Sequence, residues 1–257
     1  MVNLEILHFI KLHVSGFPFQ LKINGGPVLF FDSDSGCSVH MPVQQWIQPG
    51  LNQLEVFPLE TASIPFPKYS RIDATIFLGP SIEETPIARL TQDMSNYPHE
   101  EREFNLYLSF ENKSNVAPLK WSKSPIIAAN ERVLSELLSI YNDVFSAIQN
   151  KNLNGLITLF KERSIDLAKR QGQDLSEFED ALREQISSRF ENPSYTAWPI
   201  KKERLRPVTY ADGKLICLET PDGCSPLLLF NETEMISSYF PIYLYRPAEG
   251  EPLTIIR

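Results

Sequence analysis

Four histidines are the side chains of this sequence best suited to acid–base chemistry, and all of them precede residue 100. His8, His13 and His40 lie in runs that alternate apolar and polar residues, whereas His99 lies in the charged run PHEEREF at 98–104. Histidine changes charge near neutral pH and is a common metal ligand. Consecutive charges are, however, more typical of a solvated loop than of a metal site. We therefore expect no metal ligands here.

The other chemistry-bearing motifs are fragments. The sequence contains no paired-histidine helix motif, nucleophile elbow, phosphate-binding glycine loop or dinucleotide fingerprint. DSDSG at 32–36 resembles part of a calcium loop but lacks the bidentate glutamate, and a turn is expected. Cys37, Cys217 and Cys224 match no zinc spacing, and no base adjoins the last two. The sequence predicts no catalytic residue, no bound metal and no cofactor.

The net charge of the chain limits the classes of partner that it can bind. The formal net charge is −8, and both halves of the chain contribute acidic excess. The main basic run, IKKERLR at 200–206, has few aromatic neighbours. An acidic chain disfavours nonspecific binding to nucleic acid or to an anionic membrane. A basic protein partner is compatible with it.

The elements of the first half alternate with a period of two residues, which is typical of strands. Leu4 to Val14, FPFQLKI, VLFF, RIDATIFLG and FNLYLSF are separated by turn signals such as NGGP. Short strands without helical periodicity between them predict an antiparallel β-sandwich domain over 1–118.

The run HMPVQQWIQPGLNQLEV at 40–56 carries the strongest turn signal of that half. We expect alternating strands on both sides of QPGLN, with Val43 and Ile47 on one face. Gly50 and Asn52 should shape the connection, and Trp46 and Leu54 should pack in the core rather than bind a sugar. The pattern Pro42, Ile47, Gly50, Asn52, Leu54, Val56 resembles galactose-binding-like and immunoglobulin-like sandwich lobes.

The period changes to that of helices after residue 124. Ser124 is the expected N-cap of the first helix, with Pro125 following it. A second helix is expected over 153–170 with Asn152 as its cap, and a third from the capping box Ser176…Glu179 to Asn192-Pro193. Strands then return as PVTY, KLICLE, PLLLF, SSYFPIYLYR and LTIIR, with Asp-Gly hairpin signals at 212 and 222. The prediction is an α+β chain whose second domain, 125–257, packs three helices on an antiparallel meander.

This element order resembles the cone-shaped nuclear-transport-factor-like or cystatin-like folds. It departs from them because three helices run together with no hairpin before the third. The resemblance implies a cavity between helices and sheet. Enzymes of that fold commonly use a His–Asp pair, but no histidine occurs in this half. Tyr141 with Asp143 or Asp166 is the conceivable substitute, although helix core and helix surface explain these residues better.

The expected compartment is the cytoplasm. The first seventeen residues have no basic leader and are interrupted by polar residues. No apolar run approaches the ~18 residues that a membrane helix needs. The three cysteines should then be free thiols.

An acidic chain without a catalytic constellation points to protein recognition. The leading hypothesis is an immunity protein that neutralises a toxin delivered by a bacterial type VI or contact-dependent system. The alternative is a small-ligand-binding protein or enzyme that uses the cone cavity, and a third reading is a carbohydrate-binding module. Two surfaces are candidates: acidic loops and a ring-bearing C-terminal sheet face. The favoured partner-binding residues are the loop glutamates Glu83, Glu84, Glu100, Glu101 and Glu103; the rings are Tyr239, Phe240, Tyr243 and Tyr245.

Overall fold

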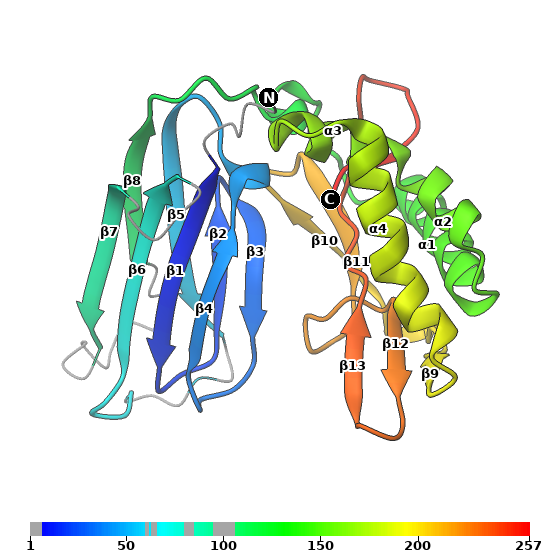
Figure 1. Cartoon of the computed structure of the whole chain (residues 1–257), viewed down its shortest axis with the longest axis horizontal. Coiled ribbons are helices and arrows are strands. Elements are labelled where there is room, and N and C mark those ends of the chain that lie inside the picture. Colours follow the sequence, from blue (N-terminus) through cyan, green and yellow to red (C-terminus); the bar gives the residue numbers. More distant parts are fainter. Residues whose placement is uncertain (1–6, 60–61, 63–65, 80–84, 95–105) are drawn as a thin grey trace. The chain divides into compact units, whose positions relative to one another are not determined.

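The computed structural model describes residues 7–59, 62, 66–79, 85–94 and 106–257 of the chain (Figure 1). These residues belong to two compact units, Met1–Leu119 and Lys120–Arg257, and each is described by itself. The α+β class predicted from the sequence is confirmed.

The first unit is an antiparallel β-sandwich. One sheet has the strand order β4-β1-β6-β7, and the other has the order β3-β2-β5-β8 (Figure 1). The first sheet consists of β1 (His8–Ser15), β4 (Cys37–Pro42), β6 (Arg71–Leu78) and β7 (Thr85–Asp93). The second consists of β2 (Phe19–Ile23), β3 (Gly26–Phe31), β5 (Gly50–Pro58) and β8 (Leu106–Asn112).

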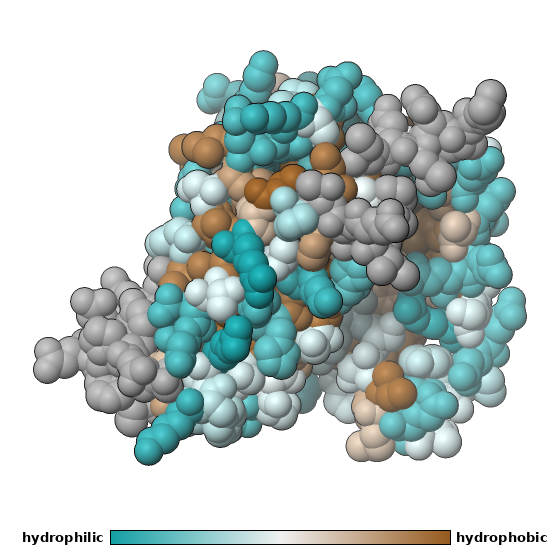
Figure 2. Space-filling model, turned by 60° about the vertical axis from the view of Figure 1, so that its left-hand side comes forward, coloured by the Kyte–Doolittle hydropathy of each residue, from teal (hydrophilic) through white to brown (hydrophobic). Residues whose placement is uncertain are grey.

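The core of the sandwich comes from the alternation seen in the sequence. Buried residues alternate with more exposed ones along β1, β2 and the central parts of β5 and β6, as expected for period-2 strands with one solvated face. The fully enclosed members include Ile10, Leu12, Val14, Leu21, Ile23, Leu54, Val56, Ile72 and Ile76. The opposite faces carry most of the charged residues. In the view of Figure 2, which turns the side holding β7 and β8 forward, hydrophobic residues are interspersed among hydrophilic ones.

The segment before β5 differs from its prediction. Gln44–Trp46 forms a 3₁₀ turn instead of a strand. In this turn the buried Gln44 side chain contacts His8. Gln44 Oε1 accepts from the His8 backbone N–H at 3.0 Å and lies 2.5 Å from His8 Nδ1. A side chain that alternated with its neighbours in a strand would not be free to fold back in this way. Trp46 and Leu54 are buried as expected.

The second unit contains four helices where three were predicted. They are α1 (Glu131–Gln149), α2 (Leu153–Leu159), α3 (Lys161–Arg170) and α4 (Leu175–Glu191). The predicted second helix is divided at Phe160, which ends α2 and begins α3 while its ring stays buried in the core. A one-residue bend leaves the apolar period almost unchanged, so the sequence pattern does not reveal it.

Two predicted caps are wrong and one is confirmed. Asn130, not Ser124, caps α1, because residues 120–123 form a separate 3₁₀ turn. Asp174 replaces Ser176 as the cap of α4, since its carboxylate accepts from the Ser176 N–H at 2.8 Å. Asn152 caps α2 as predicted, accepting from Gly155 N.

The strands of the second unit form two antiparallel sheets, not one meander. One sheet has the order β10-β11-β14-β15, with β10 (Arg206–Tyr210), β11 (Leu215–Glu219), β14 (Leu244–Tyr245) and β15 (Thr254–Ile255). The other has the order β13-β12-β9, with β13 (Ile236–Tyr239), β12 (Leu228–Asn231) and β9 (Tyr195–Ala197).

The predicted strand SSYFPIYLYR is divided between these sheets at Phe240 and Pro241. Pro241 has no N–H to donate to a ladder, which favours the break. The Asp212-Gly213 hairpin is confirmed, since it joins β10 to β11. The second Asp-Gly signal does not join paired strands, because β11 and β12 belong to different sheets.

The core of the second unit lies between its helices and its sheets. Leu137, Tyr141 and Val144 of α1 pack with Ile216 and Leu218 of β11, and each is at most 1% exposed. Within the described ranges, no helix has the length and apolar character needed to cross a bilayer.

Candidate recognition groove of the second unit

A groove of about 290 Å³ opens on the second unit beside the β13-β12-β9 sheet. One wall is the segment that follows β9, and the other wall is the turn that follows β11. Leu228 and Tyr239, which are direct partners in the β12–β13 ladder, also line it. The complete lining is Trp198–Lys201, Arg204, Leu205, Thr220–Asp222, Cys224–Pro226, Leu228 and Tyr239.

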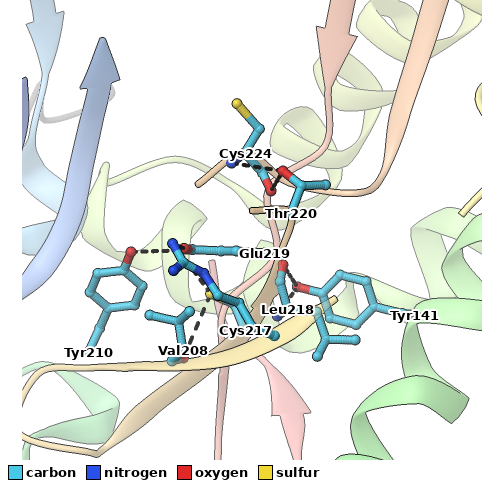
Figure 3. Close-up of polar contacts among 9 residues, drawn as sticks. Tyr141, Val208, Tyr210, Cys217, Leu218, Glu219, Thr220 and Cys224 are labelled. Atoms are coloured by element: carbon cyan, nitrogen blue, oxygen red, sulfur yellow. Dashed lines mark hydrogen bonds and ion pairs between the residues drawn. The ribbon is translucent and has the colours of Figure 1, made fainter. Parts of the chain in front are cut away.

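Both walls are held by local hydrogen bonds. The backbone N–H of Trp198 donates to the carbonyl of Leu228 at 3.0 Å, which extends the β9–β12 pairing by one residue. The indole then meets the Phe230 ring edge-on, with ring centroids 5.6 Å apart. In the other wall, the Thr220 hydroxyl accepts from Cys224 N at 3.2 Å and donates to Cys224 O at 3.1 Å (Figure 3). The groove is therefore built on hydrogen-bonded backbone.

Two aromatic side chains of the groove are unusually open to solvent. Trp198 is 47% exposed and Tyr239 is 45% exposed. Large aromatic side chains are ordinarily buried when nothing binds them, because each carries a large apolar surface. Burial and the nearby Cys224 thiol raise the pKa of Tyr239, so its hydroxyl stays protonated at neutral pH. These rings offer apolar contact and a hydrogen-bond donor but no base.

Charge around the groove is asymmetric. Lys201 and Arg204 line the wall after β9, whereas Asp222 lies in the opposite wall. Exposed Lys202 lies between the two cations in sequence, within a short 3₁₀ turn at Lys202–Arg204. An apolar floor with a cationic rim suits an aromatic or aliphatic anchor that carries an acidic group beside it.

A second polar cluster surrounds Glu219, at the end of β11 (Figure 3). The Tyr210 hydroxyl donates to its carboxylate at 2.6 Å, and the Cys217 thiol lies 3.6 Å from the same oxygen. Arg206 is 3.7 Å from the other oxygen. Glu219 is only 7% exposed. Its lone pairs are thus already engaged by the chain's own donors, which is what a buried carboxylate requires.

The neighbours of Glu219 hold their protons. Burial and the adjacent Glu219 carboxylate raise the pKa of the Cys217 thiol well above its usual value. Burial likewise raises the pKa of Tyr141 and of Tyr243. A nucleophilic cysteine needs the opposite shift, toward the thiolate. The cluster can donate hydrogen bonds, but it supplies no activated nucleophile.

The three cysteines are free, and their burial predicts different reactivities. In the native protein, Cys217 should react with a thiol reagent at least tenfold more slowly than Cys224, because Cys217 is buried and its raised pKa suppresses the thiolate. In denaturant, all three thiols should react with the reagent at the same rate. The measurement is labelling time followed by mass spectrometry of peptides. Equal native rates for Cys217 and Cys224 would contradict this expectation.

The conceivable Tyr/Asp acid–base pair does not form. The Tyr141 hydroxyl accepts from Leu218 N at 2.9 Å, and its other contacts are the carbonyls of Leu218 and Ile242. Asp143 is exposed on α1. Asp166 is buried against two arginines, Arg170 at 2.9 Å and Arg257 at 2.8 Å. Tyr141 is therefore bonded to backbone groups, Asp143 faces solvent and Asp166 is paired with arginines, so none of them pairs with another.

The predicted partner-binding glutamates, Glu83, Glu84, Glu100, Glu101 and Glu103, lie outside the described residues. Of the four C-terminal rings, only Tyr239 is exposed and lines the groove, while Phe240 and Tyr245 are buried. Tyr243 packs edge-on to Tyr210, with centroids 5.9 Å apart. In the described ranges, no three His, Cys, Asp or Glu side chains are grouped to hold a metal ion.

A shared site for Trp198, Lys201 and Arg204 was not predicted from the sequence. The available signal was WPIKKERL at 198–205, where a tryptophan stands directly before a basic run. The chain matches no known family model, no curated protein and no solved structure.

Proposed function

We propose that this protein is a non-enzymatic recognition protein that binds another protein, and that it acts as an immunity protein against a secreted bacterial toxin. The observation that carries the recognition part is the groove in which Trp198 and Tyr239 are both nearly half exposed. Exposed Trp and Tyr flanking an apolar floor are the residues that most often dominate protein interfaces. Type VI and contact-dependent systems are the expected toxin sources.

The polar clusters support binding over catalysis. Glu219 is engaged by Tyr210 and Cys217, and Asp166 by two arginines. A general base or nucleophile must instead offer its reactive atom to a substrate. The predicted acidic loops remain a second contact region of this proposal, where glutamates would speed association with a basic partner.

The groove specifies the partner's chemistry more closely. Its floor favours an apolar anchor, and Lys201 and Arg204 favour an acidic residue next to that anchor. The residues that enter should be few and central, with weaker polar contacts at the rim.

The alternative is a small-ligand-binding protein or an enzyme with a cone-fold cavity. A volume of about 290 Å³ is near the lower end of ligand pockets, so the groove itself keeps a ligand-binding role open. The space between the helices and β11 is filled by Leu137, Val144, Ile216 and Leu218, all fully buried, which argues against a cone cavity there.

Replacing Tyr239 with alanine should weaken partner binding about 30-fold, the effect of losing roughly 2 kcal/mol at a hot spot. The partner would first be recovered from the native host by affinity capture and mass spectrometry, and its affinity then measured with purified proteins. Tyr69→Ala is the matched control, because Tyr69 is 65% exposed in the first unit. Equal affinities of the two variants would exclude the groove as the binding site.

Two further observations separate the candidate functions. A toxin gene directly beside this gene, and protection of cells from that toxin, would support the immunity proposal. Copurification of a metabolite that Trp198→Ala releases, with no protein partner recovered, would support the alternative.

A further inference from the structure

The outer face of the β4-β1-β6-β7 sheet gathers cations from three strands. In the β1–β6 and β6–β7 ladders, Lys11 lies opposite Thr75, and Thr75 lies opposite Arg89. Strands are spaced by about 4.8 Å, so the Lys11 and Arg89 backbones are about 10 Å apart. Arg71 is two residues from Asp73 on β6 and shares its face. Long side chains from these positions can meet over one central area.

This area is a hollow of about 580 Å³. Three permanent cations line it, Lys11, Arg71 and Arg89, against a single lining carboxylate, Asp73. The hydroxyls of Ser38 and Thr75 and the His13 ring add polar groups, while Phe77 and Pro86 give one end an apolar boundary. The hollow is cationic although the chain as a whole has a net charge of −8.

Asp73 holds the two guanidinium groups in place. Its Oδ2 lies 3.1 Å from Arg89 Nη2 and 3.5 Å from Arg71 Nη2. Thr91 donates to Oδ1 at 3.2 Å and accepts from Arg89 Nε at 3.2 Å. The arginine side chains nevertheless remain 63% and 53% exposed. A guanidinium has five N–H donors, so these contacts leave donors available to a ligand.

We infer that this hollow binds a small phosphorylated molecule of about nucleotide size. Two oriented arginines and a lysine match a phosphate group, because guanidinium N–H pairs bind its oxygens in a bidentate manner. The volume lies within the range of small-molecule sites. The apolar boundary at Phe77 can accept a planar or aliphatic part of the same molecule. The hollow belongs to the first unit and the groove to the second, and occupancy of the hollow does not depend on the proposed function.

The negative net charge of the chain favours a small ligand over a nucleic-acid strand at this site. A long polyanion extends beyond the hollow and experiences repulsion from an acidic protein. A compact di- or triphosphate concentrates its charge within reach of the three cations. Binding should weaken with added salt, as charge-assisted contacts at an exposed site do.

The test uses the full chain and calorimetric titration with inorganic pyrophosphate, ATP, citrate and a single-stranded DNA oligonucleotide. Arg89→Gln and Lys11→Gln each remove one cation of the hollow. Lys113→Gln is the matched control, because it removes an exposed charge directly after β8, in the sandwich's other sheet, where the Lys113 side chain is 85% exposed. Melting temperatures verify that all variants fold.

Pyrophosphate or ATP should bind wild type and Lys113→Gln saturably, with affinity at least about tenfold lower for Arg89→Gln and Lys11→Gln, as expected for loss of one charge-assisted contact. Absence of saturable binding at millimolar probe would overturn the inference. So would equal affinity of Arg89→Gln and the control, equal binding of citrate, or binding of the oligonucleotide alone.

Discussion

Replacing Asp166 with alanine is expected to destabilise the second unit by about 3–5 kcal/mol, the usual cost of removing one partner of a buried ion pair. The Asp166 side chain is 6% exposed, and its Oδ2 faces Arg170 Nε at 2.9 Å and Arg257 Nη1 at 2.8 Å. Those arginine side chains are 1% and 4% exposed. Without Asp166, two enclosed guanidinium groups lose this carboxylate, and neither can discharge at neutral pH.

Urea unfolding followed by circular dichroism would measure the change. Asp143→Ala is the matched control, since it removes an exposed carboxylate from α1. Its expected effect is within about 0.5 kcal/mol, as for most surface substitutions. A result for Asp166→Ala within 1 kcal/mol of that control would show that the pair contributes little.

The same ion cluster predicts a pH dependence. Burial alone would raise the pKa of Asp166, but the charges of Arg257 and Arg170 outweigh it and hold the pKa below the usual 3.8. A carboxyl with a depressed folded pKa contributes stability that is complete above its unfolded pKa. This contribution is lost as the pH falls through the folded pKa. The stability difference between wild type and Asp166→Asn should therefore be largest near neutral pH and shrink below about pH 4.

The sandwich was predictable because its strands follow a local rule. Alternation along β1 and β6 puts one set of side chains in the core and the other in solvent, and the sequence displays that alternation directly. Likewise, the apolar residues of α1 recur at helical spacing, so the helix itself was predictable. Asn152 was identified as a cap because an N-cap uses a side chain and a backbone group only three residues apart.

Features that depend on distant partners could not be predicted. The turn at Gln44–Trp46 exists alongside a bond from Gln44 to His8, thirty-six residues away. Which strands pair is also nonlocal: β11 is hydrogen-bonded to β14, although β12 follows it in sequence. Local pattern identified both strands and could not choose between the pairings.

The candidate sites were harder to predict for the same reason. The exposure of Trp198 depends on the course of the chain after β9, and no sequence rule separates it from the buried Trp121. The cations of the hollow come from Lys11, Arg71 and Arg89, residues separated by up to 78 positions. Only the register of two ladders brings them together. Conversely, the absence of a catalytic motif was a local observation and guided the expectation of binding.

Replacing Asn52 with alanine is expected to destabilise the sandwich by about 2–3 kcal/mol, because it leaves enclosed polar groups without partners. Asn52 is 1% exposed and shapes the QPGLN connection through its side chain. Its Oδ1 accepts from Gln48 N at 2.9 Å, and its Nδ2 donates to the carbonyls of Gln48 and Gly50, both at 2.9 Å. The Asn24 amide also donates to Oδ1, at 2.8 Å.

The expected loss of stability stays at about 2–3 kcal/mol because some groups bonded to Asn52 also have a second hydrogen-bond partner. The Gln48 carbonyl keeps a bond from Asn112 at 3.1 Å, and Asn24 keeps its bond to the Trp46 carbonyl at 2.8 Å. Gln48 N therefore carries most of the cost, since Gly50 also pairs with Asn112 in the β5–β8 ladder. Gln53→Ala is the control, since Gln53 is the exposed next residue of the same strand. Chemical unfolding should separate the two variants by about 2 kcal/mol. If they unfold together, Gly50, whose φ is +76°, is enough to reverse the chain and Asn52 only fills space.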